Sequence, residues 1–94
     1  MYALSFDMSI ADLEEHYGVP YQGAYYEIKQ ILVKEGFYWI QGSTYMTDAD
    51  NLLNLFNAIN ALKKVDWFRH SVRDIRGFRV EEWSDFTDIV KNNR

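Results

Sequence analysis

The order in which strand-like and helix-like patterns follow one another limits the folds open to this chain. Alternating or β-rich runs, typical of strands, occupy 2–8, 37–40, 43–46 and the stretch that follows residue 71. Apolar residues three and four positions apart, typical of helices, occupy 21–35 and the segment after Thr47. The order is β-α-β-β-α-β, with a short extra helix expected over 10–17. It predicts an α+β, ferredoxin-like βαββαβ sandwich.

Connection rules turn this order into a sheet topology. Right-handed crossovers place the strands in the order 4-1-3-2, antiparallel throughout, with both long helices on one face. The run 37–40 is apolar on both sides, so we expect the helix-free face to be covered as well. A homodimer whose open faces or edge strands pack together would cover it. With 94 residues, the chain is expected to form a single domain over 1–94.

Capping residues predict where the helices begin and end. Ser9 is expected to cap the short helix, and Pro20 to open the first long one. Thr47 is expected to cap the second long helix, and Ser84 a C-terminal helix that ends near Lys91. The predicted buried face of the second long helix consists of Leu52, Leu55, Phe56, Ile59 and Leu62.

Several classes of protein are excluded by composition. The chain has no cysteine, which rules out disulfides, thiolate zinc sites and a cysteine nucleophile. A signal-peptide pattern and an apolar run of the ~20 residues that a membrane helix needs are both missing, so we expect a cytoplasmic protein. The net charge of −4 weighs weakly against a polyanionic partner. Four of the ten basic residues nevertheless fall within eleven positions, at Arg69, Arg73, Arg76 and Arg79.

The last strand carries more charge than a structural strand needs. Strict alternation would put Asp74 and Arg76 on the same face as Phe78, beside the core. A bulge at Gly77 would instead turn Phe78 toward the helices and leave the charged side chains on the opposite face. We prefer the bulge because it avoids burying two charges, and an unbroken ladder through Gly77 would rule it out.

Topology then brings distant residues together. The first strand runs antiparallel to the third and fourth, so its C-terminal end lies beside their starts. Asp7 lies at the C-terminal end of the first strand, while the other two starts carry Ser43, Tyr45, Asp74 and Arg76. We expect these five side chains to meet at one corner of the helix-free face. Without further information, an aspartate beside an arginine at such a corner is most often only an ion pair.

Three stretches of the sequence resemble the virulence-associated protein D (VapD) family. They are 1–7 (MYALSFD), 41–45 (QGSTY) and 71–87 (SVRDIRGFRVEEWSDFT), and the resemblance covers essentially the whole chain. Ser5 and Gly77 depart from the family's pattern, which has alanine at both positions. The resemblance implies a ferredoxin-like bacterial endoribonuclease, related to small CRISPR-associated nucleases and, in some genomes, the toxin of a toxin–antitoxin pair. It also implies mRNA as the substrate and Asp7 as an active-site residue.

An endoribonuclease must activate a nucleophile and stabilise a pentavalent phosphorane, and these requirements give each residue of the corner an expected role. Asp7 would act as general base, or as half of a metal site completed by the partner subunit. Arg76, alone or with Arg73, would neutralise the phosphate, and Asp74 would orient Arg76. Ser43 and Tyr45 would position the RNA backbone or donate a proton. The residues expected to bind RNA are Arg73 and Arg79.

Two questions stay open at this point. The reaction requires either no cofactor or a divalent cation such as magnesium. The sequence does not decide between them, because one carboxylate per subunit supplies few of the oxygen ligands that such a cation needs. The alternative to an enzyme is a non-catalytic dimeric interaction module that binds RNA or an antitoxin protein. In that case, the charged corner would be a structural ion pair.

Overall fold

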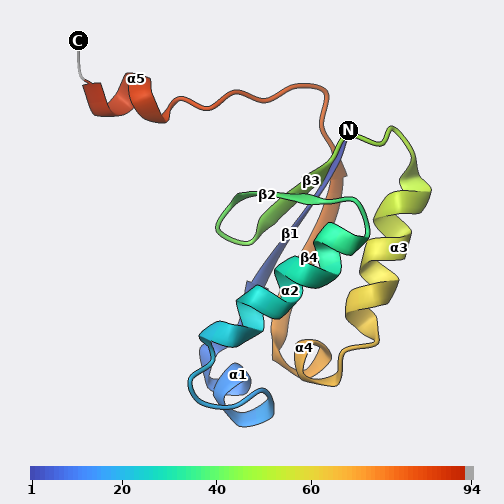
Figure 1. Cartoon of the computed structure of the whole chain (residues 1–94), viewed down its shortest axis with the longest axis vertical. Coiled ribbons are helices and arrows are strands. Elements are labelled where there is room, and N and C mark those ends of the chain that lie inside the picture. Colours follow the sequence, from blue (N-terminus) through green and yellow to red (C-terminus); the bar gives the residue numbers. More distant parts are fainter. Residues whose placement is uncertain (93–94) are drawn as a thin grey trace.

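A computed structural model describes residues 1–92, which form an antiparallel sheet with two long helices on one face (Figure 1). The strands are β1 (Tyr2–Met8), β2 (Tyr38–Gln41), β3 (Thr44–Thr47) and β4 (Val72–Arg79). The helices are α1 (Ile10–His16), α2 (Gln22–Lys34), α3 (Leu52–Lys63), α4 (Asp66–Ser71) and α5 (Thr87–Asn92). The strand order β2-β3-β1-β4 confirms the predicted ferredoxin-like arrangement. No helix in the described part is both long and apolar enough to cross a membrane.

β1 is a central strand, and its side chains alternate between two environments. Leu4 and Phe6 point into the core beneath α2 and α3 and are 0% and 6% exposed. Ser5 and Asp7 point to the face that carries no helix, and Asp7 is exposed. The rest of the buried core comes from Met8, Leu13, Ala24, Ile28, Leu32, Phe37, Tyr45, Ala58, Leu62 and Phe68. The alternation of β1 therefore assigns a face to every residue that pairs with it.

The pairing of β4 with β1 shows that the predicted bulge at Gly77 is wrong. Leu4 lies opposite Gly77 and Asp7 lies opposite Asp74, with no break between these pairs. The register shifts only beyond Asp7, and it leaves Arg73 without a partner on β1. The irregularity thus lies near the start of β4 rather than in its middle.

This regular register has a consequence for the charged side chains. Asp74, Arg76 and Phe78 share one face, and that face is the one without helices. The side chains of Asp74 and Arg76 are 53% and 77% exposed. No buried charge arises, so the reason for preferring a bulge disappears.

Gly77 is explained by helix packing. It faces the core side opposite Leu4, and Leu55 of α3 lies directly against it. A Cβ atom on Gly77 would lie 2.7 Å from Cδ2 of Leu55, which is closer than side chains approach. The missing side chain lets α3 sit close to β4.

The start of α3 also differs from the prediction. Thr47 is the buried last residue of β3, and Asn51 caps α3 instead by accepting a hydrogen bond from the Leu53 N–H at 2.8 Å. The predicted buried face of α3 is also only partly correct. Leu52 and Phe56 are 49% and 58% exposed.

Two further elements near the C-terminal end differ from the prediction. α4 was not predicted, although the aromatic side chain of Phe68 anchors it in the core. α5 begins at Thr87, whose N–H donates to Asp85 Oδ1 at 2.9 Å, so Ser84 does not cap it. The C-terminal helix itself was predicted, whereas α4 has too few apolar repeats to be read from periodicity.

Gly77→Ala is expected to lower the free energy of unfolding by about 1 kcal/mol, because the new methyl group overlaps Leu55. In a Leu55→Ala background the same change is expected to be neutral or stabilising, since the overlap is gone and alanine loses less backbone entropy. Urea unfolding of the wild type, both single variants and the double variant measures the difference. Equal effects of Gly77→Ala in both backgrounds would contradict the packing role of Gly77.

Candidate active site

Three of the predicted site residues meet at one end of the helix-free face. Asp7 lies directly opposite Asp74, and such antiparallel partners have Cα atoms about 4.5–5.5 Å apart. Nε of Arg76 donates to Oδ2 of Asp74 at 3.0 Å. This contact is the one expected of an aspartate that orients an arginine. All three side chains are exposed, so the corner is open to a large substrate.

The helix-free face changes from polar to apolar along the strands. Next to the charged corner, Ser5 lies opposite both Arg76 and Thr44, and its Oγ is 3.3 Å from Thr44 Oγ1. The following row across the sheet is apolar and consists of Tyr38, Met46, Ala3 and Phe78. The charged corner is therefore followed by an apolar row along the strands.

Ser43 and Tyr45 do not lie at this corner. Tyr45 pairs with Leu4, and its ring stacks on Phe6 with the centroids 6.3 Å apart, inside the core. Ser43 precedes β3 and lines a cavity on the same side of the sheet. The prediction that all five residues share the helix-free face is therefore wrong. The register of β3 places these two on the helix side.

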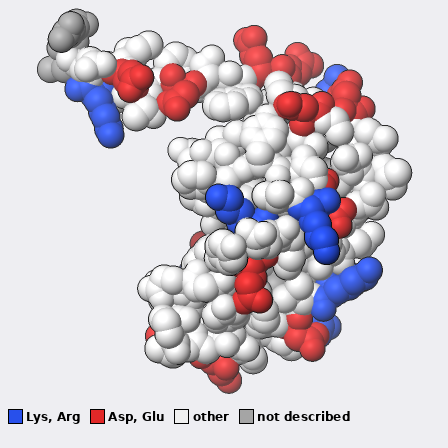
Figure 2. Space-filling view, viewed as in Figure 1, with Lys and Arg blue, Asp and Glu red and all other residues white. Residues whose placement is uncertain are grey.

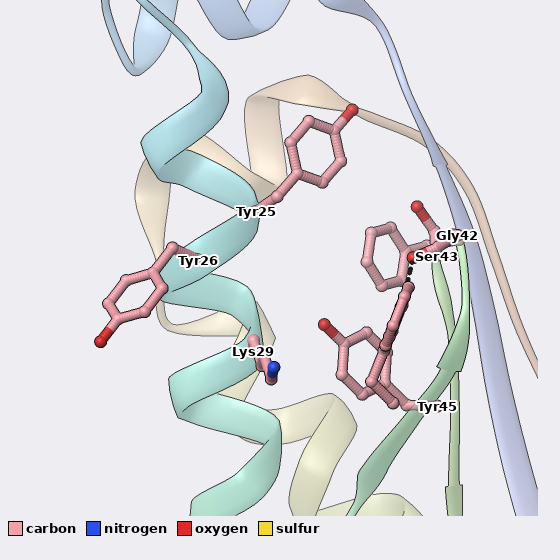
Figure 3. Close-up of a pocket in the computed structure, with 8 residues that line it drawn as sticks. Tyr25, Tyr26, Lys29, Gly42, Ser43 and Tyr45 are labelled. Carbon is pink, nitrogen blue, oxygen red and sulfur yellow. Dashed lines mark hydrogen bonds between the residues drawn. The ribbon is translucent and has the colours of Figure 1, made fainter.

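The two residues belong to a cavity of about 540 Å³ between α2 and the β2–β3 hairpin (Figure 3). Its lining comes from Tyr25, Tyr26 and Lys29 of α2, from Trp39, Gly42, Ser43 and Tyr45 of the hairpin, and from Phe6. Figure 3 shows Tyr25 and Lys29 turned toward the hairpin and the ring of Tyr26 turned away from it. The gathering of these residues depends on how α2 crosses the sheet.

Tyr25 links this cavity to Asp7. Burial raises the pKa of the Tyr25 hydroxyl, and electrostatic repulsion from the Tyr21 oxygen and the Asp7 carboxylate raises it further. β3 begins at Thr44, which pairs with Ser5 of β1. Asp7 of β1 therefore lies two residues beyond the last residue that pairs with β3. The carboxylate of Asp7 is therefore within electrostatic reach of the cavity although it points to the other face.

Tyr25 and Tyr45 act as neutral groups in the cavity. Burial raises the pKa of Tyr45 above its ordinary value of 10.0, as it does for Tyr25. Both hydroxyls therefore keep their protons at neutral pH. They can donate hydrogen bonds to a ligand, but they cannot serve there as general bases.

A metal ion would find an incomplete set of ligands at the corner. Asp7 and Asp74 are two carboxylates on one face, whereas Mg²⁺ takes six oxygen ligands, so the rest would come from water, substrate or another subunit. Among residues 1–92, the one group of three metal-ligating side chains with ligand atoms within 4.8 Å of one another is on α1. Its members are Asp12, Glu15 and His16.

The predicted RNA-binding arginines are exposed but far from each other along β4. Arg73 is the unpaired residue beside the corner, and Arg79 lies opposite Tyr2 at the other end of the strand. On the face seen in Figure 2, acidic and basic side chains are interspersed. That face therefore offers no continuous basic track for a nucleic acid.

The sequence is similar to named proteins over nearly its whole length. It is 57% identical over 91 residues to the endoribonuclease VapD of Dichelobacter nodosus, covering 97% of this chain and 98% of that protein. It is 49% identical over 94 residues to the endoribonuclease VapD of Helicobacter pylori, covering 98% and 100%. It is 46% identical over 92 residues to the endoribonuclease VapD of Haemophilus influenzae, covering 98% of this chain and 100% of that protein. No family model matches the chain.

Tyr45→Phe is expected to reduce the loss of free energy of unfolding that accompanies a rise to alkaline pH. The raised pKa of Tyr45 means that the folded state holds the proton more tightly than the unfolded chain. The resulting stabilisation is complete below the unfolded pKa and is lost as the pH rises through the folded one. Between about pH 8 and about pH 11, the wild type should lose more free energy of unfolding than the variant.

Urea unfolding at both pH values measures this difference, and Tyr26→Phe, an exposed tyrosine on α2, is the matched control. An identical loss of stability in the wild type and Tyr45→Phe would show that the hydroxyl of Tyr45 is not buried as described.

Proposed function

The chain belongs to the endoribonuclease VapD family, and we propose that it is itself an endoribonuclease that cleaves RNA at the corner of Asp7, Asp74 and Arg76. The observation that carries the proposal is the pairing of Asp7 with Asp74 across β1 and β4, with Arg76 bound to Asp74. In agreement with the family resemblance, the proposed substrate is mRNA. A cognate antitoxin remains a prediction of that resemblance.

Each group at the corner has a task in phosphodiester cleavage. The reaction needs a group that activates the nucleophile and positive charge that stabilises the phosphorane. The carboxylate of Asp7 serves as general base. The guanidinium of Arg76 forms charge-assisted hydrogen bonds to the phosphate, and Asp74 holds the guanidinium in place. Arg73 and Arg79 add contacts to more distant phosphates.

Ser43 and Tyr45 have a different task in this proposal. They line the cavity on the helix side, and Tyr45 is only 4% exposed. The backbone carbonyl of Ser43 accepts a hydrogen bond from the N–H of Phe6 at 3.2 Å, one residue before Asp7. Both residues thus position the RNA and the end of β1, and neither reaches the phosphate from the side of Asp7.

Asp7→Asn is expected to lower the cleavage rate of a defined RNA by about 100- to 1000-fold, as losses of single catalytic groups typically do. The amide keeps the shape of the side chain but cannot accept the proton. Single-turnover cleavage of a labelled RNA by the purified variant measures the effect. Asp66→Asn, which changes an exposed aspartate on α4, is the matched control.

A second variant separates catalysis from stability. The Asp74–Arg76 pair is exposed, and exposed pairs contribute little to folding, so Arg76→Ala should stay folded while it loses cleavage. Full activity of a folded Asp7→Asn variant would refute the assignment of the base. A wild-type protein that binds RNA with a steep salt dependence and yields no product would instead support the non-catalytic module.

We further propose that the protein acts as a homodimer that buries the helix-free face. The row of Tyr38, Met46, Ala3 and Phe78 gives this face an apolar centre, and Phe78 is 46% exposed. After β4 the chain extends away from the body (Figure 1). Large apolar side chains on this extension remain exposed: Trp83, Phe86, Ile89 and Val90. So much exposed apolar surface is typical of a contact region.

Phe78→Asp is expected to convert the dimer to a monomer, because it places a charge in the apolar row. Sedimentation velocity at micromolar concentration measures the change. Phe56→Asp, which alters an exposed phenylalanine on α3, is the matched control and should remain dimeric. A monomeric wild type would contradict the proposed assembly.

A further inference from the structure

We infer that the cavity between α2 and the β2–β3 hairpin is a binding site for one unpaired nucleobase of an RNA strand. The base would stack on Trp39, and its backbone would pass beside Lys29 toward Asp7. This inference rests on the proposed endoribonuclease function and adds a recognition site to it.

The size and lining of the cavity suit a planar aromatic ligand. Its volume of about 540 Å³ lies within the range of roughly 300–1,000 Å³ typical of small-molecule sites. Aromatic rings from three segments form most of the walls: Phe6, Tyr25, Trp39 and Tyr45. Single-stranded RNA is commonly held by stacking its splayed bases on such rings.

Trp39 is prepared as a stacking platform. Its ring is 53% exposed on an edge strand, so it is not needed to fill the core. Its indole Nε1 nevertheless donates to the carbonyl of Gly42 at 2.9 Å, which fixes the orientation of the ring. An exposed aromatic ring that is already oriented loses little freedom when it binds a ligand.

Lys29 supplies the charge that a nucleotide needs. Its ammonium group lies 5.9 Å from the centre of the Trp39 ring, and it is the basic side chain that lines the cavity. In a chain with a net charge of −4, a lysine held at an aromatic cavity favours an anionic ligand there. Its long stem lets the ammonium group move from the ring to a phosphate.

The cavity and the charged corner lie on opposite faces of the sheet, near the same end of β1. Phe6 forms part of the cavity wall, and Asp7 is the next residue along the chain. The charge of Asp7 contributes to the raised pKa of Tyr25, which lines the same cavity. An RNA strand whose base lies in the cavity therefore has to pass around the C-terminal end of β1 to reach Asp7 on the helix-free face. The neutral hydroxyls of Tyr25 and Tyr45 can donate hydrogen bonds to the acceptors on the edge of the base.

The test measures binding in the absence of cleavage. Asp7→Asn protein is titrated into a fluorescein-labelled single-stranded RNA of about ten nucleotides, which is within the site sizes of single-strand binders. Fluorescence anisotropy gives the dissociation constant at several salt concentrations. Trp39→Ala in this background is expected to weaken binding by about 5- to 150-fold, as expected for the loss of one stacked base.

Three variants make the result specific. Trp39→Phe keeps an aromatic ring and should retain most of the affinity. Lys29→Gln should reduce the slope of log affinity against log salt by about one. Phe56→Ala removes an exposed aromatic ring outside the cavity and should bind like the Asp7→Asn parent.

Each outcome decides between the inference and the function on which it rests. Unchanged affinity in both Trp39→Ala and Lys29→Gln would overturn the base site, even if the wild-type protein cleaves RNA. Dependence on Trp39 without any cleavage by the wild type would support the base site and refute the enzyme. If Trp39→Ala instead turned a dimer into a monomer, the cavity would be a subunit contact and the inference would fail.

Discussion

The pairing of β1 with a neighbour on each side is the constraint on which the rest of the molecule depends. Leu4 and Phe6 must enter the core, so the side chains between them must point to the other face. A slip of one residue would move the apolar set to the surface and bury Asp7. The same register carries Tyr45 into the core and keeps Asp74 on the helix-free face.

The C-terminal end of β1 is where the two proposed parts of the site meet. β3 begins opposite Ser5, so Asp7 lies past the edge of its neighbour and can influence both sides of the sheet. On one side it faces Asp74, which holds Arg76. On the other side the aromatic cavity begins one residue earlier, at Phe6. A strand of RNA that bends around this edge could place a base in the cavity and a phosphate at the charged corner.

The exposed apolar surface gives the proposed dimer its physical basis. A domain of this size buries a smaller share of its surface than a large one, so each apolar side chain left outside matters. Phe78 at the end of the apolar row and Trp83 and Phe86 on the extension are such exposed side chains. The polar end of the same face carries Asp7, and a dimer that uses the apolar end would bring two corners near each other.

What the sequence determined by itself was the order of the elements, the strand topology and the position of Asp7 at the end of β1. These follow from periodicity and connection rules, which are local or nearly so. The pairing of Asp74 with Arg76 also follows, because residues two apart in a strand share a face.

Only the tertiary structure decided the rest. Gly77 is needed because Leu55 of α3 approaches it, a contact that its own strand does not encode. Tyr45 belongs to the core because of its register with Leu4, which separates it from the corner where it was predicted. Trp39 and Lys29 line one cavity only because α2 packs beside the β2–β3 hairpin. In each case the deciding contact joins residues far apart in the chain. Periodicity along the sequence does not predict which of these distant side chains will be in contact.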